Sequence, residues 1–225
     1  MKLRFTKMHG IGNDYIYFNC FEEQIDNPET LAIELSDRHK GIGGDGIVLI
    51  LPSDVADAKM RMFNIDGSEG KMCGNAIRCV AKFVYDNKIV EKQTITIETL
   101  SGIKTLELTV NNDLVELVKV DMGAAILVPN EIPVSLPGES VVDYPINVDE
   151  KEYKITCVSM GNPHAVVFCE EIENLNLVEI GPLFENHELF PDRINTEFVK
   201  VLGNNQLEMR VWERGSGETQ ACGTE

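Results

Sequence analysis

Two cysteines of this chain stand in matching contexts that suit acid–base chemistry. Cys73 lies in KMCGNAIRC, directly before a run of small and apolar residues typical of a helix start, and Cys222 lies in the similar stretch QACGT. A thiol just ahead of a helix meets unpaired backbone N–H groups and the positive end of the helix dipole, which stabilise a thiolate. The same N–H groups can bind a carboxylate. A single cysteine is more often a small buried apolar residue, so the rest of the chain must decide its role.

The surroundings of the two cysteines repeat each other. Residues 60–75, MRMFNIDGSEGKMCGN, align without gaps on residues 209–224, MRVWERGSGETQACGT, at an offset of 149 residues. The Gly-Asn dipeptides at 12–13 and 161–162 have the same offset. Two matches at one offset indicate an internal duplication.

The duplication predicts two pseudo-symmetric domains, residues 1–121 and residues 122–225, in a chain of the α+β class. Duplicated domains usually pack about a pseudo-twofold axis, and equivalent residues near that axis face each other. Cys73 and Cys222 are therefore expected to approach one point from opposite sides.

Hydrophobic periodicity predicts the elements that must position these residues. One helix is expected over 28–40, with a basic last turn, and another begins just after Cys73. Alternating apolar residues and turn residues predict strands over 46–51, 58–64, 94–99, 104–110, 114–120, 196–202 and 207–213.

Composition excludes several classes of partner. The net charge of −17 argues against nucleic acid and anionic membranes, both of which require a basic surface. The N-terminal stretch MKLRFTKMHGIGND lacks the apolar core of a signal peptide, so a cytoplasmic location is expected.

The six cysteines form no C-x-x-C pair and no zinc-like group, and GIGGDG at 41–46 lacks the Lys-Ser/Thr of a phosphate-binding loop. No metal or cofactor is expected.

Two thiols that face one carbon suit inversion at an acidic carbon beside a carboxylate. One thiolate removes the proton from one face, and the opposing thiol delivers another from the far face. N–H groups at the helix start would stabilise the developing enediolate charge. The remaining cysteines lie in apolar patterns and are predicted to be structural: Cys20, Cys79, Cys157 and Cys169.

Five motifs together resemble the diaminopimelate epimerase family: HGIGNDY, FNIDGSEGKMCGNAIRC, GNPHAVVF, PDRIN and ERGSGETQACGT. The resemblance implies a cofactor-independent isomerase that converts LL- to meso-diaminopimelate in lysine and peptidoglycan precursor biosynthesis. It also implies two similar domains, each a barrel-like mixed sheet around a central helix, with the active site in the cleft between them. A cytoplasmic homodimer is implied as well, with no nucleic acid or membrane partner.

The resemblance assigns roles position by position. Cys73 and Cys222 match the two acid–base cysteines, and His164 and Glu213 match residues that assist them. The positions that match substrate-binding residues are Asn13, Asn64, Gly74, Asn75, Asn162, Asn195, Glu213, Arg214, Gly223 and Thr224. An arginine and amide donors suit a carboxylate, whereas a glutamate suits an ammonium group. Gly46 stands where some family members have a substrate-binding glutamine.

The two halves differ on the C-terminal side of the cysteine. Cys73 is followed by a predicted helix and three strands, whereas Cys222 is followed by only Gly223, Thr224 and Glu225. We therefore expect either a natural protein that continues beyond residue 225, or a truncated form with a weakened second domain and little activity.

Two alternatives stay open from the sequence. A racemase of another amino acid, histidine for example, could use the same scaffold, because Glu213 and Arg214 suit a distal amino acid group without requiring one. An inactive truncated relative that only binds an amino acid is the second alternative. Exchange of the substrate α-proton with deuterated water would separate an enzyme from a binding protein.

Overall fold

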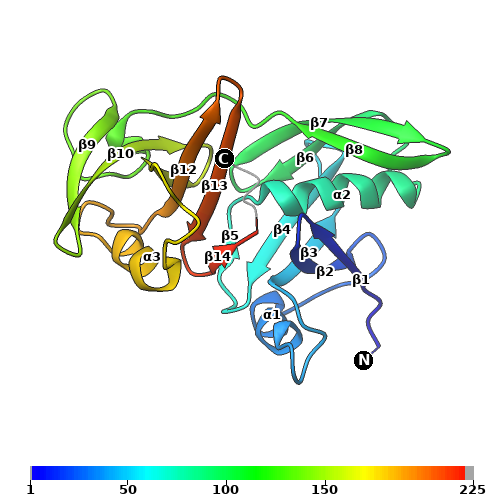
Figure 1. The fold of residues 1–225 in the computed structure, drawn as a ribbon. Helices are drawn as coiled ribbons and strands as arrows, with labels where there is room; N and C mark the ends of the chain where they lie inside the picture. The colour runs from blue at the N-terminus through cyan, green and yellow to red at the C-terminus, as the bar shows by residue number, and fades with distance from the viewer. Residues whose placement is uncertain (1, 221–225) are drawn as a thin grey trace. The chain divides into compact units, whose positions relative to one another are not determined.

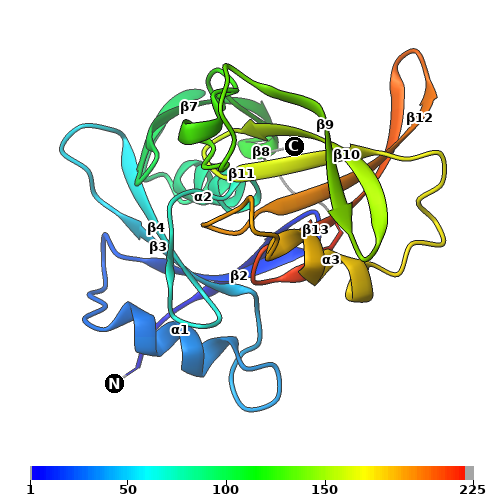
Figure 2. The ribbon, with the colours of Figure 1, turned by 90° about the vertical axis from the view of Figure 1, so that its left-hand side faces the viewer.

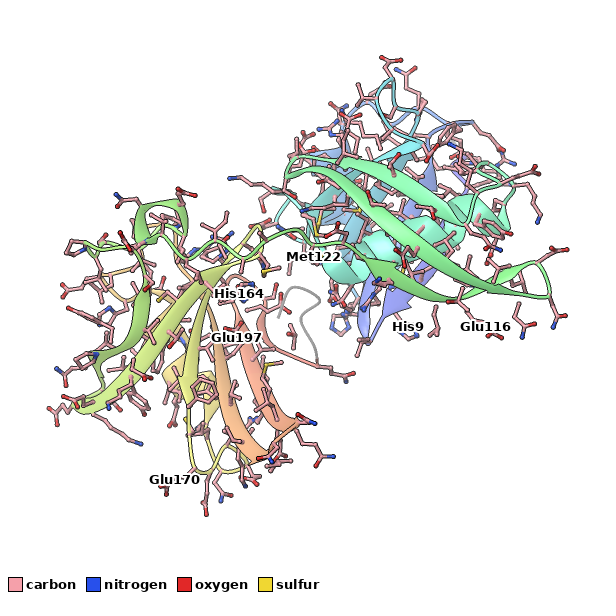
Figure 3. The ribbon with its side chains drawn as sticks, turned by 90° about the horizontal axis from the view of Figure 1, so that it is seen from above. His9, Glu116, Met122, His164, Glu170 and Glu197 are labelled. Carbon is pink, nitrogen blue, oxygen red and sulfur yellow. The ribbon has the colours of Figure 1, made fainter. Side chains whose placement is uncertain are left out.

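The chain divides into two compact units, residues 1–122 and residues 123–225. A computed structural model describes residues 2–220, and Figure 1 shows each unit as a β-sheet accompanied by few helices. Figure 3 labels Met122, where the first unit ends. Within residues 2–220, no helix is long and apolar enough to cross a membrane.

The first unit is built on a mixed sheet. Its strands are, in chain order, β1 (Thr6–Gly10), β2 (Asn13–Asn19), β3 (Gly46–Leu51), β4 (Ala58–Asn64), β5 (Glu69–Gly70), β6 (Thr94–Thr99), β7 (Gly102–Asn111) and β8 (Leu114–Val120). They pair in the order β1-β2-β3-β4-β6-β7-β8, with β5 on β4. The pairs β2–β3 and β4–β6 are parallel, and the other pairs are antiparallel. The strands predicted in this half are confirmed. Strands such as β4 and β6 alternate between buried and more exposed residues, whereas β3 is a short apolar run that is buried almost throughout.

Helix α2 (Gly74–Asp86) packs against the curled first sheet. It contacts β1, β2, β4, β6, β7 and β8, and Figure 2 shows β7 and β8 curling around it. Ile77, Val80, Ala81 and Val84 form its buried stripe at helical spacing. This stripe belongs to the main hydrophobic core of the unit, and it holds the N-terminus of α2 at a fixed place on the sheet.

Helix α1 (Pro28–Ser36) is shorter than the sequence predicts. The expected helix over 28–40 was wrong at its C-terminal end, because Asp37 breaks it. The Asp37 carboxylate accepts hydrogen bonds from the N–H groups of His39 and Lys40, at 2.8 and 2.9 Å. Those N–H groups would have to bond to carbonyls one turn earlier for the helix to continue. The basic residues at 38–40 therefore lie beyond the helix.

The second unit contains another mixed sheet. Its elements are, in chain order, the 3₁₀ turn η1 (Pro129–Glu131), β9 (Val141–Val148), β10 (Lys151–Ser159), β11 (Pro163–Phe168), α3 (Leu177–Glu185), β12 (Asn195–Gly203), β13 (Gln206–Glu213) and β14 (Gly217–Thr219). The strands pair in the order β14-β13-β12-β11-β10-β9, and only β11–β12 is parallel among these described pairs. Helix α3 packs against β9, β12, β13 and β14.

The offset of 149 residues recurs in the geometry. Ile47 of β3 pairs with Phe63 of β4, and 149 positions later Thr196 of β12 pairs with Trp212 of β13. The bounds of α1 and α3 also differ by this offset at both ends. Helix α3 therefore corresponds to α1. The expectation of a central helix in each half holds for α2 in the first unit, and no described helix of the second unit corresponds to α2.

Candidate functional site

Cys73 caps the N-terminus of α2. Its backbone is extended, and its sulfur accepts a hydrogen bond from the N–H of Ala76 at 3.4 Å. The half-buried thiol also donates to Oδ1 of Asn13, 3.4 Å away. Both the N–H group and the helix dipole favour negative charge on the sulfur. The helix start that the sequence predicts immediately after Cys73 is confirmed.

Asn13 connects this thiol to a group of charged residues. Its Oδ1 also faces Nδ2 of Asn75 at 3.5 Å, and its Nδ2 donates to Oδ2 of Asp45 at 2.8 Å. Asp45 in turn accepts a hydrogen bond from Arg38 at 2.9 Å. The amide of Asn13 is thus held by partners on both sides, so its oxygen stays directed at the thiol.

Asn75 lies in the first turn of α2 and is 2% exposed. Its Oδ1 accepts a hydrogen bond from Arg78 at 2.5 Å. Strand β1 passes so close that a Cβ placed on Gly10 would lie 2.9 Å from the backbone oxygen of Asn75. Glycine at position 10 therefore lets β1 reach the helix start.

Asp14 follows Asn13 and carries a strongly acidic carboxyl. Burial alone would raise its pKa, but hydrogen bonds from Arg38 and Lys7 outweigh burial and lower the pKa from 3.8 to about 2. Arg38 donates to both Asp14 and Asp45. One guanidinium therefore connects the two aspartates that surround Asn13.

Asn64 and Gly46 face each other in register at the end of the β3–β4 pair. The amide of Asn64 donates to Oγ of Ser68 at 3.0 Å, within its own turn. A Cβ at Gly46 would lie 2.0 Å from the carbonyl oxygen of Phe63. A glutamine side chain cannot occupy this backbone, which gives a physical reason for the glycine.

His164 is the centre of a buried polar group in the second unit. Its Nδ1 lies 2.6 Å from Oε1 of Glu197, and its Nε2 lies 3.0 Å from Oδ1 of Asn162. His164 and Glu197 are each 2% exposed. They come from the neighbouring parallel strands β11 and β12, and Figure 3 shows them beside each other in this unit.

The end of β13 carries two further predicted site residues. Asn195 is buried, and its Oδ1 accepts a hydrogen bond from the backbone N–H of Arg214 at 2.9 Å. The carboxylate of Glu213 accepts one from Oγ1 of Thr219 at 2.6 Å. The structure thus brings Asn195, Glu213 and Arg214 together, because Thr196 and Trp212, which adjoin Asn195 and Glu213 in the chain, lie opposite each other in the β12–β13 register.

The guanidinium of Arg214 is held at the carbonyl oxygen of Asp192, 2.9 Å away. Burial lowers the pKa of Arg214, and the nearby charge of Arg193 lowers it further. Glu185, at the end of α3, accepts hydrogen bonds from Arg193 at 2.9 Å and from the N–H of Gly215 at 3.0 Å. This carboxylate fixes the turn that follows Arg214.

Cys222, Gly223 and Thr224 lie outside the described residues. The hairpin before them is described, and it repeats the one before Cys73. Phe63 pairs with Glu69 across β4–β5, and Trp212 pairs with Glu218 across β13–β14, at the offset of 149.

Sequence reasoning missed three carboxylates that organise these groups: Asp45, Glu185 and Glu197. Glu197 had a detectable signal, because a charged residue precedes the apolar Phe198 and Val199 in the predicted strand, and it shares a strand face with Asn195. Asp45 lies in a glycine-rich turn and Glu185 in a stretch without a predicted element, and only the folded chain shows their partners.

The other cysteines lie in less polar surroundings. All five described cysteines are free thiols. Burial raises the pKa of Cys20 to about 11 and that of Cys157 to about 12, and it also raises the pKa of Cys79 and Cys169. Thiols of this kind are poor acid–base groups at neutral pH.

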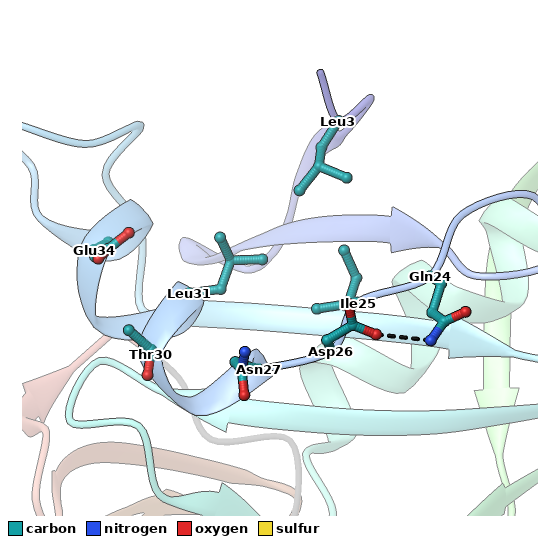
Figure 4. Close-up of a pocket in the computed structure, with 8 residues that line it drawn as sticks. All are labelled: Leu3, Gln24, Ile25, Asp26, Asn27, Thr30, Leu31 and Glu34. Atoms are coloured by element: carbon teal, nitrogen blue, oxygen red, sulfur yellow. Dashed lines mark hydrogen bonds between the residues drawn. The ribbon is translucent and has the colours of Figure 1, made fainter. Parts of the chain in front are cut away.

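A pocket lies beside α1 in the first unit (Figure 4). Figure 4 shows the hydrogen bond from Gln24 to Asp26, 2.7 Å long, at its edge. The lining contains none of the predicted site residues and consists of Leu3, Gln24, Ile25, Asp26, Asn27, Thr30, Leu31 and Glu34. The pocket is therefore separate from the group around Cys73.

Solved structures with a similar fold include a probable proline racemase from Agrobacterium radiobacter and a hydroxyproline epimerase from Agrobacterium vitis. Their TM-scores are 0.75 and 0.69, and each is 15% identical to this chain. The matches cover 99% of this chain and 74% and 73% of those chains. At this identity the likeness concerns the two-domain fold.

Sequence comparison gives a more specific result. The diaminopimelate epimerase family model matches residues 5–128 and 156–225. A diaminopimelate epimerase of Acetivibrio thermocellus is 60% identical over 222 residues, which is 99% of this chain and 79% of that protein. A diaminopimelate epimerase of Methanococcus maripaludis is also 60% identical, over 99% of this chain and 80% of that protein. This chain belongs to the diaminopimelate epimerase family.

Proposed function

We propose that this protein is a diaminopimelate epimerase that interconverts LL- and meso-diaminopimelate, in the biosynthesis of lysine and peptidoglycan precursors. Its membership of the family supports the reaction class, which is an isomerase. The structural observation that carries the proposal is the thiol of Cys73 at the N-terminus of α2, in contact with Asn13.

In the proposed reaction, Cys73 and Cys222 act on opposite faces of one α-carbon. One cysteine, as the thiolate, removes the α-proton and becomes a thiol. The other, as the thiol, gives its proton to the opposite face and becomes a thiolate. Proton number is conserved and the carbon is inverted, so no oxidant or reductant is consumed.

The negative charge that forms during this step needs nearby donors. The helix start at Gly74 and Asn75 provides backbone N–H groups for the carboxylate beside the reacting carbon. Gly223 and Thr224 are proposed to do the same beside Cys222. Such hydrogen-bond donors stabilise negative charge most strongly where water is excluded. Asn75 is buried.

The distal amino acid end of the substrate is proposed to bind polar side chains away from the reacting carbon. Arg214 supplies a cation for a carboxylate, and Glu213 supplies an anion for an ammonium group. The amides of the remaining predicted residues complete this set: Asn13, Asn64, Asn162 and Asn195. We also propose that His164 and Glu213 assist the cysteines, and that the protein works as a cytoplasmic homodimer.

An exchange assay tests the function directly. Purified protein is incubated in deuterated water with LL- or meso-diaminopimelate, and α-deuteration and isomer composition are followed by NMR and chiral chromatography. Deuteration and conversion of both isomers are expected. Turnover of another amino acid in a parallel panel, without conversion of diaminopimelate, would contradict the proposed substrate, and binding without exchange would indicate an inactive relative.

A further inference from the structure

The polar pair His164–Glu197 occupies a place that the duplicated half fills with one aromatic and one aliphatic residue of its core. At the offset of 149, His164 corresponds to Tyr15 and Glu197 corresponds to Val48. Tyr15 and Val48 belong to the buried hydrophobic core under α2. The fold therefore does not require an ionisable pair at this place.

Burial of this pair is costly unless both groups are well partnered. A carboxylate removed from water loses strong hydration, and the Oε2 atom of Glu197 has no hydrogen-bond partner among the described residues. The short contact of 2.6 Å between Oε1 and Nδ1 of His164 compensates part of this cost. Buried ionisable groups of this kind are concentrated at functional sites.

The ring of His164 faces an oxygen on each side. Nδ1 meets the carboxylate of Glu197, and Nε2 meets the amide oxygen of Asn162 at 3.0 Å. A neutral imidazole has one N–H and one acceptor nitrogen, whereas the doubly protonated ring donates from both nitrogens. Two acceptor oxygens therefore match the doubly protonated ring, with the Glu197 carboxylate as its counter-ion.

We propose that Glu197 is a positioning residue that keeps His164 doubly protonated, so that His164 holds the amide oxygen of Asn162 and turns the amide NH₂ toward the substrate. Asn162 then presents a donor, which suits a substrate carboxylate. With a neutral ring protonated on Nδ1, Nε2 would accept from the NH₂ of Asn162, and the amide oxygen would face the substrate. This inference rests on the proposed function, in which Asn162 binds substrate.

The test substitutes Glu197→Gln, which keeps the side-chain shape and removes the charge. Nδ1 and Nε2 shifts are measured by ¹⁵N NMR at pH 7, and His164→Gln identifies the signals of this ring among the four histidines. We expect the doubly protonated pattern in the wild type and a neutral, singly protonated pattern in Glu197→Gln. The exposed Glu170, labelled in Figure 3, provides the matched control Glu170→Gln, which should change nothing.

Kinetics supply the second readout. Glu197→Gln should raise KM for diaminopimelate about tenfold and leave kcat much less changed, because one hydrogen bond to a charged group is lost in the bound state. Glu197→Asp, which keeps the charge on a shorter stem, should recover part of the ring signature. Denaturant unfolding of each variant reports on folding separately.

The outcomes separate this inference from the proposed function. A neutral His164 ring in the wild type, or an unchanged ring and KM in a folded Glu197→Gln variant, would overturn the positioning role. If the wild type does not turn over diaminopimelate, the proposed function fails, while the ring spectra still decide what Glu197 does to His164.

Discussion

Gly181 of α3 lies directly against the indole of Trp212. A Cβ built on Gly181 would be 2.2 Å from a ring atom of Trp212, which is far inside van der Waals contact. At the equivalent places in the first unit, 149 residues earlier, Ala32 and Phe63 lie in one hydrophobic cluster. The larger ring, that of Trp212, is thus paired with a glycine on the helix, and the smaller ring, that of Phe63, is paired with an alanine.

Gly181→Ala should therefore destabilise the protein. Alanine is favoured over glycine in a helix by about 1 kcal/mol, but overpacking a close-packed contact costs about 1–3 kcal/mol or more. Because three ring atoms lie within 2.6 Å of the added Cβ, we expect the overpacking cost to win by about 2 kcal/mol. Denaturant unfolding measures the difference.

The first unit suggests the compensating change. In a Trp212→Phe background, Gly181→Ala should reduce the free energy of unfolding only slightly. The hydrogen bond of 2.7 Å from the indole N–H to Glu185 is absent from both proteins in this background, so it does not affect the difference between them. Gly203→Ala is the matched control, since a Cβ there meets nothing within 4 Å. An equal cost of Gly181→Ala in both backgrounds would contradict this packing account.

Helix α3 also shows where the sequence was not informative. The segment Leu177–Glu185 contains both Gly181 and Pro182, two residues that weaken a helix in its interior. No helix was predicted there, because local propensity and periodicity are the only signals that a sequence offers. Packing against the second sheet stabilises α3 despite these residues.

The site, too, could be predicted only where the sequence carries a local signal. Cys73 was identifiable because a helix start has a local signature, and the repeat identified its equivalent. Glu197 was not identified, because its role depends on His164, which is 33 residues away in the chain and beside it only in the folded sheet. Contacts between distant segments leave little trace in a single sequence.

Cys73→Ala should reduce epimerase turnover by more than about a thousandfold, because one face of the α-carbon loses its proton donor or acceptor. Cys73→Ser should leave only a trace of activity, since a hydroxyl is a much weaker acid than a thiol. Exchange of the α-proton in deuterated water measures both variants. Cys79→Ala, at a buried thiol outside the predicted site, is the comparison; normal turnover by Cys73→Ala would rule out the two-thiol mechanism.

Arg214→Ala should mainly weaken substrate binding. Loss of a partly buried charged contact to the distal carboxylate is worth about 2 kcal/mol, or roughly thirtyfold in affinity. The backbone N–H that bonds to Asn195 is retained in this variant. Isothermal titration with diaminopimelate measures the change, with the exposed Arg4→Ala as control. An affinity within twofold of the wild type would show that another group binds the distal end.

Acid stability should depend on Asp14. Burial would raise the pKa of this carboxyl, but Arg38 and Lys7 lower it from 3.8 to about 2 in the folded protein. A carboxyl whose pKa is lower when folded binds protons more tightly in the unfolded chain. Its ion pairs therefore add stability above about pH 4, and this contribution is lost as the pH falls toward about 2.

Asp14→Asn should reduce the free energy of unfolding at pH 7 and make its decline between pH 4 and 2 shallower than in the wild type. Denaturant unfolding across this range measures both effects, beside the exposed Asp54→Asn. Parallel profiles for Asp14→Asn and the wild type would mean that the contacts of Asp14 with Arg38 and Lys7 contribute nothing to folding stability.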